Sequence, residues 1–255
     1  MIDLHSHLLP AIDDGSTSMR ASLRMAREAV AEGIEAMLMT PHHMNGRYRN
    51  NKADVIALTA DFQAMLDQEG IPLQVFPSQE VRINGELIDA LAADEILFAD
   101  EGNQYLLLEF PDDDVPTYSA DMIFNLMQRG ITVQIAHPER NTKLMAQPEI
   151  LYQLVERGAI AQVTASSYVG AFGKKVQKFA EAIVSHNLGH VFVSDVHDLP
   201  NRTYNMQAAF AKLRKQQGAE ISGLFALNAE AIIDGRPIQR LLPAPIVKRW
   251  LRNRF

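Results

Sequence analysis

The sequence contains no cysteine among its 255 residues. Without thiols the chain cannot form disulfides or thiolate zinc sites, and no mechanism with a cysteine nucleophile is available to it. Any metal ion that it binds must therefore be held by nitrogen and oxygen ligands.

Several other familiar signals are missing. No stretch approaches the ~20 apolar residues that span a bilayer, and Met1–His5 lacks the pattern of a signal peptide, so we expect a cytoplasmic protein. The net charge is −7 and the only long basic run is the tail Lys248–Arg254, which disfavours non-specific nucleic-acid binding. No Walker motif, GxSxG elbow or dinucleotide fingerprint is present.

Short apolar runs alternate with helical patterns along the chain, which predicts βα units and a mostly parallel sheet. About seven strands suit a closed or distorted α/β barrel, although an open doubly wound sheet has the same periodicity. We expect a single domain over residues 1–255, with about 219–255 packed on it as a C-terminal extension. The strands are expected at Met1–His5, Ala36–Thr40, Leu73–Glu80, Tyr105–Phe110, Ile131–Ala136, Ala159–Thr164 and Val191–Ser194.

Side chains that can bind metal recur where these strands end. His5 and His7 are two residues apart on one strand and therefore point to the same face. In parallel barrels the carboxyl ends of the strands meet at one mouth, so we expect the whole set to converge. Its members are His5, His7, Asp13, Asp14, His42, Glu80, Glu109, His137, Asp195 and His197, with His43 expected to contact either a ligand side chain or the substrate.

Nitrogen and oxygen ligands without sulfur suit Mn²⁺, Zn²⁺ or Fe. Eight or more candidates are too many for one ion with three or four ligands. Two or three ions that share carboxylates account for them better, and such clusters are common in phosphate-ester hydrolysis. The pattern therefore predicts a metal-dependent phosphoesterase.

Two arginines lie close to these ligands in the sequence. Arg140 follows His137 by three residues, and Arg202 follows His197 by five. A guanidinium matches a phosphoryl group with two parallel donors, so we expect both arginines to bind the substrate phosphate. The alternative is that each pairs with a carboxylate on a loop. The segment Arg47–Arg49 is either a loop that recognises an aromatic phosphoester or simply an exposed loop.

The ordered motifs resemble the PHP (polymerase and histidinol phosphatase) superfamily. They are Asp3–His7, Leu9–Gly15, Thr40–His43, Gln79–Glu80, Leu108–Glu109, Ala136–Arg140 and Ser194–His197, and the resemblance covers roughly residues 1–240. Within the superfamily the chain most resembles the bacterial tyrosine-protein phosphatases of capsular and exopolysaccharide operons. An acidic residue in the Asp13–Asp14 loop is typical of that subgroup, whereas many PHP enzymes have histidine there.

The resemblance implies a distorted TIM-like (β/α)7 barrel with a three-metal cluster, usually described with Mn²⁺, for which Fe, Zn, Co or Mg are alternatives. By position, one ion would be held by His5, His7, Glu80 and Asp195. A second would be held by Glu80, Glu109 and His137, and the third by His42, His197 and an acidic residue, which we expect to be Asp14 rather than Asp13.

The implied substrate is the phosphorylated tyrosine tail of a partner kinase that regulates polysaccharide synthesis. Water activated by the metals would attack phosphorus, with Arg140 and Arg202 stabilising the charge on the phosphoryl oxygens. A small phosphomonoester resembling histidinol phosphate is an alternative substrate. Two further alternatives are an amidohydrolase and a non-catalytic regulator that binds the kinase and keeps the metals for stability.

Overall fold

A computed structural model describes residues 1–197 and 202–247. The basic tail Lys248–Arg254 lies outside the described residues. Every strand pair found in the described ranges is parallel, as the βα pattern predicted. The strands are β1 Ile2–Ser6, β2 Ala36–Met39, β3 His42–His43, β4 Gln74–Pro77, β5 Glu80–Arg82, β6 Tyr105–Glu109, β7 Thr132–Ile135, β8 Ile160–Thr164 and β9 Val191–Val193.

Two expected strands are each divided in two. The strand predicted at Ala36–Thr40 resumes beyond Pro41 as β3, and the one predicted at Leu73–Glu80 is interrupted between β4 and β5. Pro41 lacks a donor, but its carbonyl oxygen accepts a hydrogen bond of 3.1 Å from the amide of Glu80. The two interruptions therefore lie side by side, and pairing passes from the order β1-β2-β4 to the order β3-β5-β6-β7-β8-β9.

The first and last strands also meet. Ser6 forms a parallel bridge with Val196, the amide of Asp195 donates to the carbonyl oxygen of His5 at 2.9 Å, and the amide of His7 donates to that of Val196 at 3.0 Å. The parallel strands are therefore curled, and the carboxyl ends of β1 and β9 are held together.

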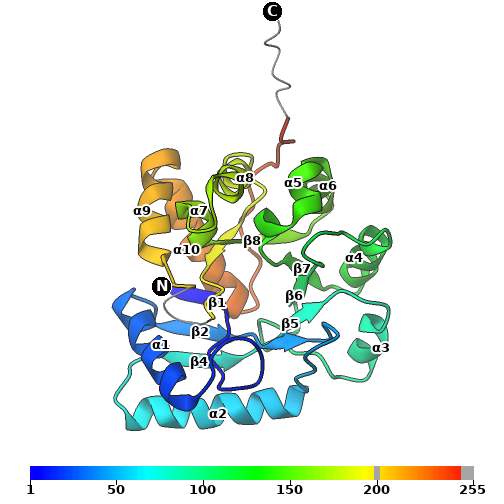
Figure 1. Cartoon of the computed structure of the whole chain (residues 1–255). Coiled ribbons are helices and arrows are strands. Elements are labelled where there is room, and N and C mark those ends of the chain that lie inside the picture. Colours follow the sequence, from blue (N-terminus) through cyan, green and yellow to red (C-terminus); the bar gives the residue numbers. More distant parts are fainter. Residues whose placement is uncertain (198–201, 248–255) are drawn as a thin grey trace, which may run out of the picture.

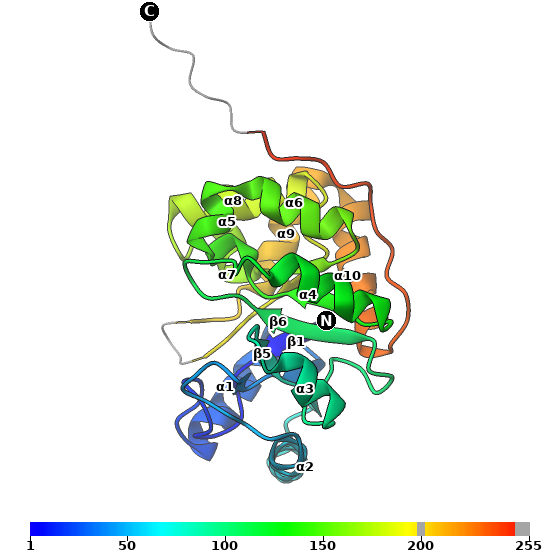
Figure 2. The same ribbon diagram turned by 90° about the vertical axis from the view of Figure 1, so that its right-hand side faces the viewer.

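Helices surround this array (Figure 1). Helices α1 to α3 lie on one side of the central strands, whereas α4, α5, α6 and α8 lie on the other (Figure 2). The helices are α1 Met19–Ala31, α2 Lys52–Gln68, α3 Leu87–Ala92, α4 Ser119–Gln128, the 3-10 helix η1 Pro138–Arg140, α5 Thr142–Ala146, α6 Pro148–Glu156, α7 Ala165–Val169, α8 Lys174–Ser185, α9 Met206–Gln217 and α10 Ala219–Ile233.

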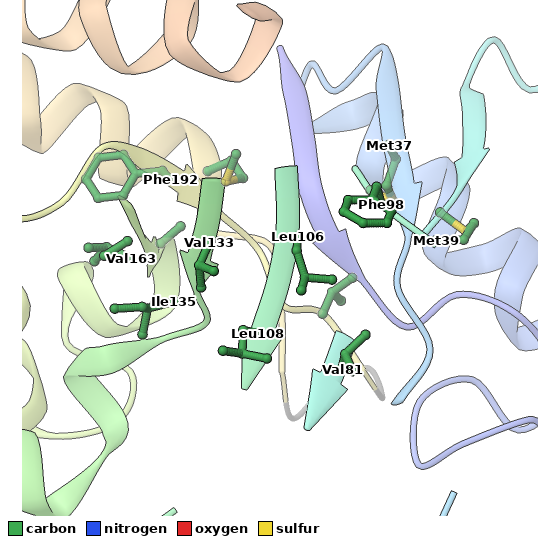
Figure 3. Packing of buried hydrophobic residues seen from close by; sticks show 14 of the residues in the cluster. Met37, Met39, Val81, Phe98, Leu106, Leu108, Val133, Ile135, Val163 and Phe192 are labelled. Carbon is green, nitrogen blue, oxygen red and sulfur yellow. The ribbon is translucent and has the colours of Figure 1, made fainter. Parts of the chain in front are cut away.

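Strand alternation separates an apolar face from a polar one. Val133 and Ile135 on β7, and Val163 on β8, belong to the large buried cluster between strands and helices (Figure 3). Gln134, between Val133 and Ile135, and Gln162, next to Val163, are also fully buried but face the opposite way, and they hydrogen-bond to each other at 3.0 Å. The inner face of these strands thus carries a polar network that leads towards the site.

The segment from residue 219 onward showed no clear pattern in the sequence. It begins with α10, whose Ile232 is fully buried in a second apolar cluster with Leu4 and Val191. Farther along, the Arg240 guanidinium donates to the carbonyl oxygens of Val155, Gly158 and Ala159. No helix in the described part of the chain is both long and apolar enough to cross a bilayer.

Candidate metal centre

The nine predicted ligands are brought together at the carboxyl ends of the strands. Neighbouring strands align them, because His42 on β3 pairs in register with Glu80 on β5, and Arg82 pairs with Glu109 on β6. Each of the nine side chains places a nitrogen or oxygen atom within 4 Å of another member, and the set is His5, His7, Asp14, His42, Glu80, Glu109, His137, Asp195 and His197.

Two of these residues have unusual backbone conformations. His137 (φ 31°) and Asp195 (φ 49°) lie in the left-handed region, each two residues beyond the end of its strand, β7 and β9 respectively. Such conformations cost a non-glycine residue on the order of 1–3 kcal/mol and concentrate at functional sites. Here both turns occur where a strand end delivers a side chain to the shared cluster.

The imidazoles of His5 and His7 face each other through their Nε2 atoms. Gln162 donates its amide to Gln134, so its oxygen is free to accept from His5 Nδ1 at 3.1 Å. His7 Nδ1 likewise lies 2.7 Å from an oxygen of Asp13. With each Nδ1 directed at an oxygen acceptor, the two Nε2 atoms face the cluster and are only 3.2 Å apart.

Two carboxylates point into the same space. Glu80 Oε2 lies 3.3 Å from His5 Nε2 and 3.4 Å from His7 Nε2, and Asp195 Oδ1 lies 3.4 and 3.5 Å from them. Burial lowers the pKa of His7, but the surrounding carboxylates, chiefly Asp13, outweigh it and raise that pKa well above its usual value. The converging acceptors thus attract positive charge.

Unpartnered buried atoms support the same conclusion. Among the described residues, His42 Nδ1, Glu80 Oε2 and Asp195 Oδ1 are buried without a hydrogen bond, although His42 Nδ1 and Glu80 Oε2 lie 2.9 Å apart as an ion pair. Burial raises the pKa of Glu80, but the imidazoles of His5 and His42 outweigh it and hold the pKa well below its usual range. Glu80 is therefore a buried anion, and a cation is the partner that such a group requires. The donor set fits divalent metal ions bound through nitrogen and oxygen.

Three overlapping groups of side chains have the spacing of a metal site. They are His5, His7 and Glu80; His42, Glu80 and Glu109; and His7, Asp14, His42 and His197. These groups differ from the three ligand sets that the resemblance implies, because His7 and His42 each belong to two groups and neither Asp195 nor His137 belongs to any. His137 remains close by, with Nε2 at 2.8 Å from Glu80 Oε1 and 3.9 Å from Glu109 Oε1.

The two adjacent aspartates have different surroundings. Asp13 uses both oxygens within the protein, accepting from His7 Nδ1 and from the amides of His42 and Gly15. Asp14 instead directs Oδ1 towards His42 Nε2 at 3.2 Å and His197 Nε2 at 3.6 Å. Asp13 therefore orients a histidine, and Asp14 faces the cluster. Glycine is required at position 15, because a Cβ there would lie 2.2 Å from the His7 carbonyl oxygen.

Both predicted arginines reach the cluster, but they contact a carboxylate. Arg140 and Arg202 each donate through Nη2 to Asp195 Oδ2, the oxygen that points away from His5 and His7. Burial raises the pKa of Asp195, but these two cations outweigh it and hold that pKa well below its usual range. The Nε atoms of both arginines are buried without an acceptor in the described part of the chain.

A third arginine was missed by the sequence analysis. Arg82 donates from Nε to Glu109 Oε2 at 2.9 Å. It follows Glu80 by two residues on β5, so the alternation of side chains along a strand already placed both on one face. That spacing was the available signal.

A cavity of about 710 Å³ opens over the cluster. Seven of the predicted ligands line it, together with Arg47, Arg82, Arg140 and Arg202 and the aromatic residues Tyr48, Phe110 and Phe172. The Tyr48 ring is nearly parallel to that of His42, with centroids 6.1 Å apart, and the Arg140 guanidinium lies 5.5 Å from the Phe172 centroid. The cavity therefore combines buried anions, cations and aromatic walls, which suits an anionic ester with an aromatic group.

Comparison with known proteins agrees with this chemistry. A family model described as capsular polysaccharide synthesis, CpsB/CapC, matches residues 1–234. Tyrosine-protein phosphatase YwqE of Bacillus subtilis (strain 168) is 41% identical over 255 residues, covering 100% of both chains. Tyrosine-protein phosphatase CpsB of Streptococcus pneumoniae is 26% identical, covering 91% of this chain and 98% of that protein.

A solved structure is similar over almost the whole chain. It comes from crystal structures of YwqE from Bacillus subtilis and CpsB from Streptococcus pneumoniae, described as unique metal-dependent tyrosine phosphatases. The TM-score is 0.94 at 40% identity, covering 97% of this chain and 100% of that chain.

Proposed function

The chain belongs to the capsular polysaccharide synthesis family CpsB/CapC, and we propose that it is a metal-dependent protein-tyrosine phosphatase. The observation that carries the proposal is the convergence of buried, unpartnered carboxylate and imidazole atoms beneath a cavity lined by arginines and aromatic rings. The similar proteins named as tyrosine phosphatases agree with it. They give no support to the amidohydrolase or to a phosphatase of histidinol phosphate.

We propose that the nine clustered side chains hold two or three divalent ions, with Mn²⁺ the first choice. When bound, such ions activate water as a nucleophile and neutralise charge on a phosphoryl group. Glu80 would be the shared ligand, because its two oxygens face different imidazoles, with Oε2 near His5 and Oε1 near His137. Asp13 and Gln162 orient the rings of His7 and His5 through Nδ1, so that Nε2 of each would be available to hold a metal ion.

The arginines have donors to spare for the substrate. A guanidinium carries five N–H donors, and the contact with Asp195 is made through Nη2 of Arg140 and of Arg202. We propose that Asp195 anchors both guanidinium groups while their remaining donors bind phosphoryl oxygens. The unpartnered Nε atoms of both arginines support this role, and charge that builds up in the transition state strengthens it.

The proposed substrate is phosphotyrosine on the tail of a partner tyrosine kinase that regulates polysaccharide synthesis in the cytoplasm. The aromatic lining of the cavity supports a phenolic ester, since Tyr48 and Phe172 can contact a tyrosine ring. The description of the family as a capsular polysaccharide synthesis family supports the biological setting.

We also propose that residues 1–255 form one domain built on a distorted (β/α)7 barrel. If β2–β3 and β4–β5 each count as one position, the parallel strands follow one another in chain order. The bridge between Ser6 and Val196 supports closure. Amide hydrogen exchange tests it, because stable closure should protect the amides of His7 and Asp195 as strongly as those of β7.

The experiment that tests the function is metal replacement with substrate comparison. Protein stripped of metal by unfolding and refolding with chelator should hydrolyse neither phosphotyrosyl peptide nor p-nitrophenyl phosphate. Mn²⁺, Fe²⁺, Zn²⁺, Co²⁺ or Mg²⁺, added singly, should restore activity to different extents, and elemental analysis should find more than one ion per active chain. Full activity without metal would refute the proposal, and so would hydrolysis of amides in preference to phosphate esters.

A further inference from the structure

A second hollow of about 540 Å³ lies beside the cavity over the cluster. Both hollows are lined by Arg47 and Tyr48, so the loop that carries these residues forms the ridge between them. The far side of the second hollow is formed by Asn84, Gly85 and Glu86, just before α3. The surface available to a ligand therefore continues from the metal centre across this loop.

The ridge is held by a defined set of hydrogen bonds. Asn45 Oδ1 accepts from the amides of Arg47 at 3.0 Å and Tyr48 at 2.7 Å. From the other wall, the Asn84 side chain donates to the carbonyl oxygen of Met44 at 3.0 Å. These bonds fix the loop backbone, so Arg47 and Tyr48 are presented at the boundary of the two hollows.

The two arginines that line the second hollow, Arg47 and Arg49, differ in whether a carboxylate lies near them. Arg49 lies between two carboxylates, 3.5 Å from Glu86 and 3.5 Å from Glu95. Arg47 is exposed and has no carboxylate within 4 Å among the described residues. Its guanidinium instead lies 4.9 Å from the centroid of the Tyr48 ring. Arg47 is thus a cation without a counter-ion at the edge of the site.

We propose that the second hollow binds the polypeptide that flanks the phosphotyrosine, and that Arg47 pairs there with an acidic side chain of the substrate. This inference rests on the proposed function. With its phosphate over the metal cluster and its ring against the aromatic walls, a phosphotyrosine must leave the first cavity through its own backbone. An extended chain advances ~3.3 Å per residue, so residues within a few positions of the phosphotyrosine can reach Arg47 across the ridge.

Paired peptides test the pairing directly. The two peptides of a pair differ only in having Glu or Gln near the phosphotyrosine, and the measured quantity is the ratio of their kcat/KM values. For the metal-loaded wild-type protein we expect a ratio of about 3–5 in favour of Glu, the scale of one exposed ion pair. Arg47→Gln should bring the ratio to about 1, and raising the salt concentration should reduce it in the wild type. Arg24→Gln, which removes an exposed charge on α1, is the matched control and should keep the wild-type ratio.

New charges introduced at Gly85, on the far side of the second hollow, provide a second test of the pairing. A Cβ at this position would meet nothing within 4 Å, and the backbone does not require glycine. Gly85→Arg should therefore raise the preference for the acidic peptide, Gly85→Glu should reverse it, and Gly85→Gln controls for side-chain volume. A wild-type ratio of 1, or an unchanged ratio in both Arg47→Gln and Gly85→Glu, would overturn the inference. If the metal-loaded protein hydrolysed other phosphomonoesters but no phosphotyrosyl peptide, the proposed function would fail first, and the inference with it.

Discussion

The two ends of the parallel strands are built in opposite ways. At the carboxyl ends, Glu80 and Asp195 are buried carboxylates with unpartnered oxygens, and Asp195 also has a left-handed backbone. Near the other end, Leu4, Val191 and Ile232 form a buried apolar cluster to which α10 contributes. In α/β barrels the first end carries chemistry and the second carries stability. The same division is visible here within single strands, because β1 contains both Leu4 and His5.

The difference is one of free energy. Burial of apolar side chains such as Ile232 stabilises the fold by roughly 25 cal/mol per Å² removed from water. Burial of Glu80 and Asp195 is unfavourable unless cations compensate it, and in the protein alone that compensation comes from histidines and arginines. Metal binding should therefore couple to stability at one end only. Changes at the two ends should separate activity from folding.

The largest effect is expected from Glu80→Gln, which removes the charge of the shared carboxylate. We expect kcat/KM to fall by roughly 10³-fold, since each loss of preorganised charge at such a site costs at least 10². Elemental analysis should show less than the wild-type metal content. Glu149→Gln, an exposed change on α6, is the control. Normal metal content with normal turnover would remove Glu80 from the site.

At the apolar end, Ile232→Ala should lower the stability of the fold and leave activity and metal content unchanged. Ile232 is fully buried, so the free energy of unfolding should fall by about 3 kcal/mol, within the range for such truncations. Ile232→Val should cost only about 1 kcal/mol. Urea unfolding measures both, and kcat/KM at 25 °C with metal content should stay at wild-type values. A loss of metal in Ile232→Ala would show that the two ends are not independent.

Arg140→Ala and Arg202→Ala test whether the two arginines, which contact Asp195, also bind the phosphoryl group of the substrate. If their donors bind phosphoryl oxygens, kcat/KM should fall by roughly 10²-fold with metal content retained. Lysine should rescue poorly, because a point charge does not reproduce the guanidinium fork. Should the arginines serve only to hold Asp195, their loss would instead lower metal affinity and melting temperature while turnover of the metal-saturated enzyme stays normal.

The smallest effect concerns His190, next to the apolar end. Burial is the main cause that lowers the pKa of this residue from 6.5 to about 3. The unfolded chain therefore takes up a proton below pH 6.5 that the folded protein refuses until about pH 3, so stability is lost as the pH falls through this window.

His190→Asn keeps an acceptor for the amide of Ala161, which donates to His190 Nδ1, but it does not titrate. Between pH 7 and 5.5 the wild type should lose about 1 kcal/mol more than this variant. Urea unfolding at both pH values measures the difference. Parallel pH profiles would indicate that His190 can be protonated within the fold.

Much of the site could be predicted because ligand chemistry is local. Residues two apart in an extended chain share a face, and this rule puts His7, one residue beyond β1, beside His5. Arg82 obeys the same rule and was overlooked. The breaks at Pro41 and beside Glu80 could not be anticipated in this way, since they depend on pairing between segments that are almost forty residues apart.

The sequence alone determined the kinds of atoms at the site and the strand ends that carry them, because the absence of cysteine and the strand periodicity are local properties. Only the tertiary structure decided which atoms meet. It turned Asp14 rather than Asp13 towards His42 and His197, set Arg140 and Arg202 on one oxygen of Asp195, and placed Arg47 over the Tyr48 ring at the ridge. Distances between residues far apart in the chain depend on how the strands curl, and that curvature is a property of the packed whole.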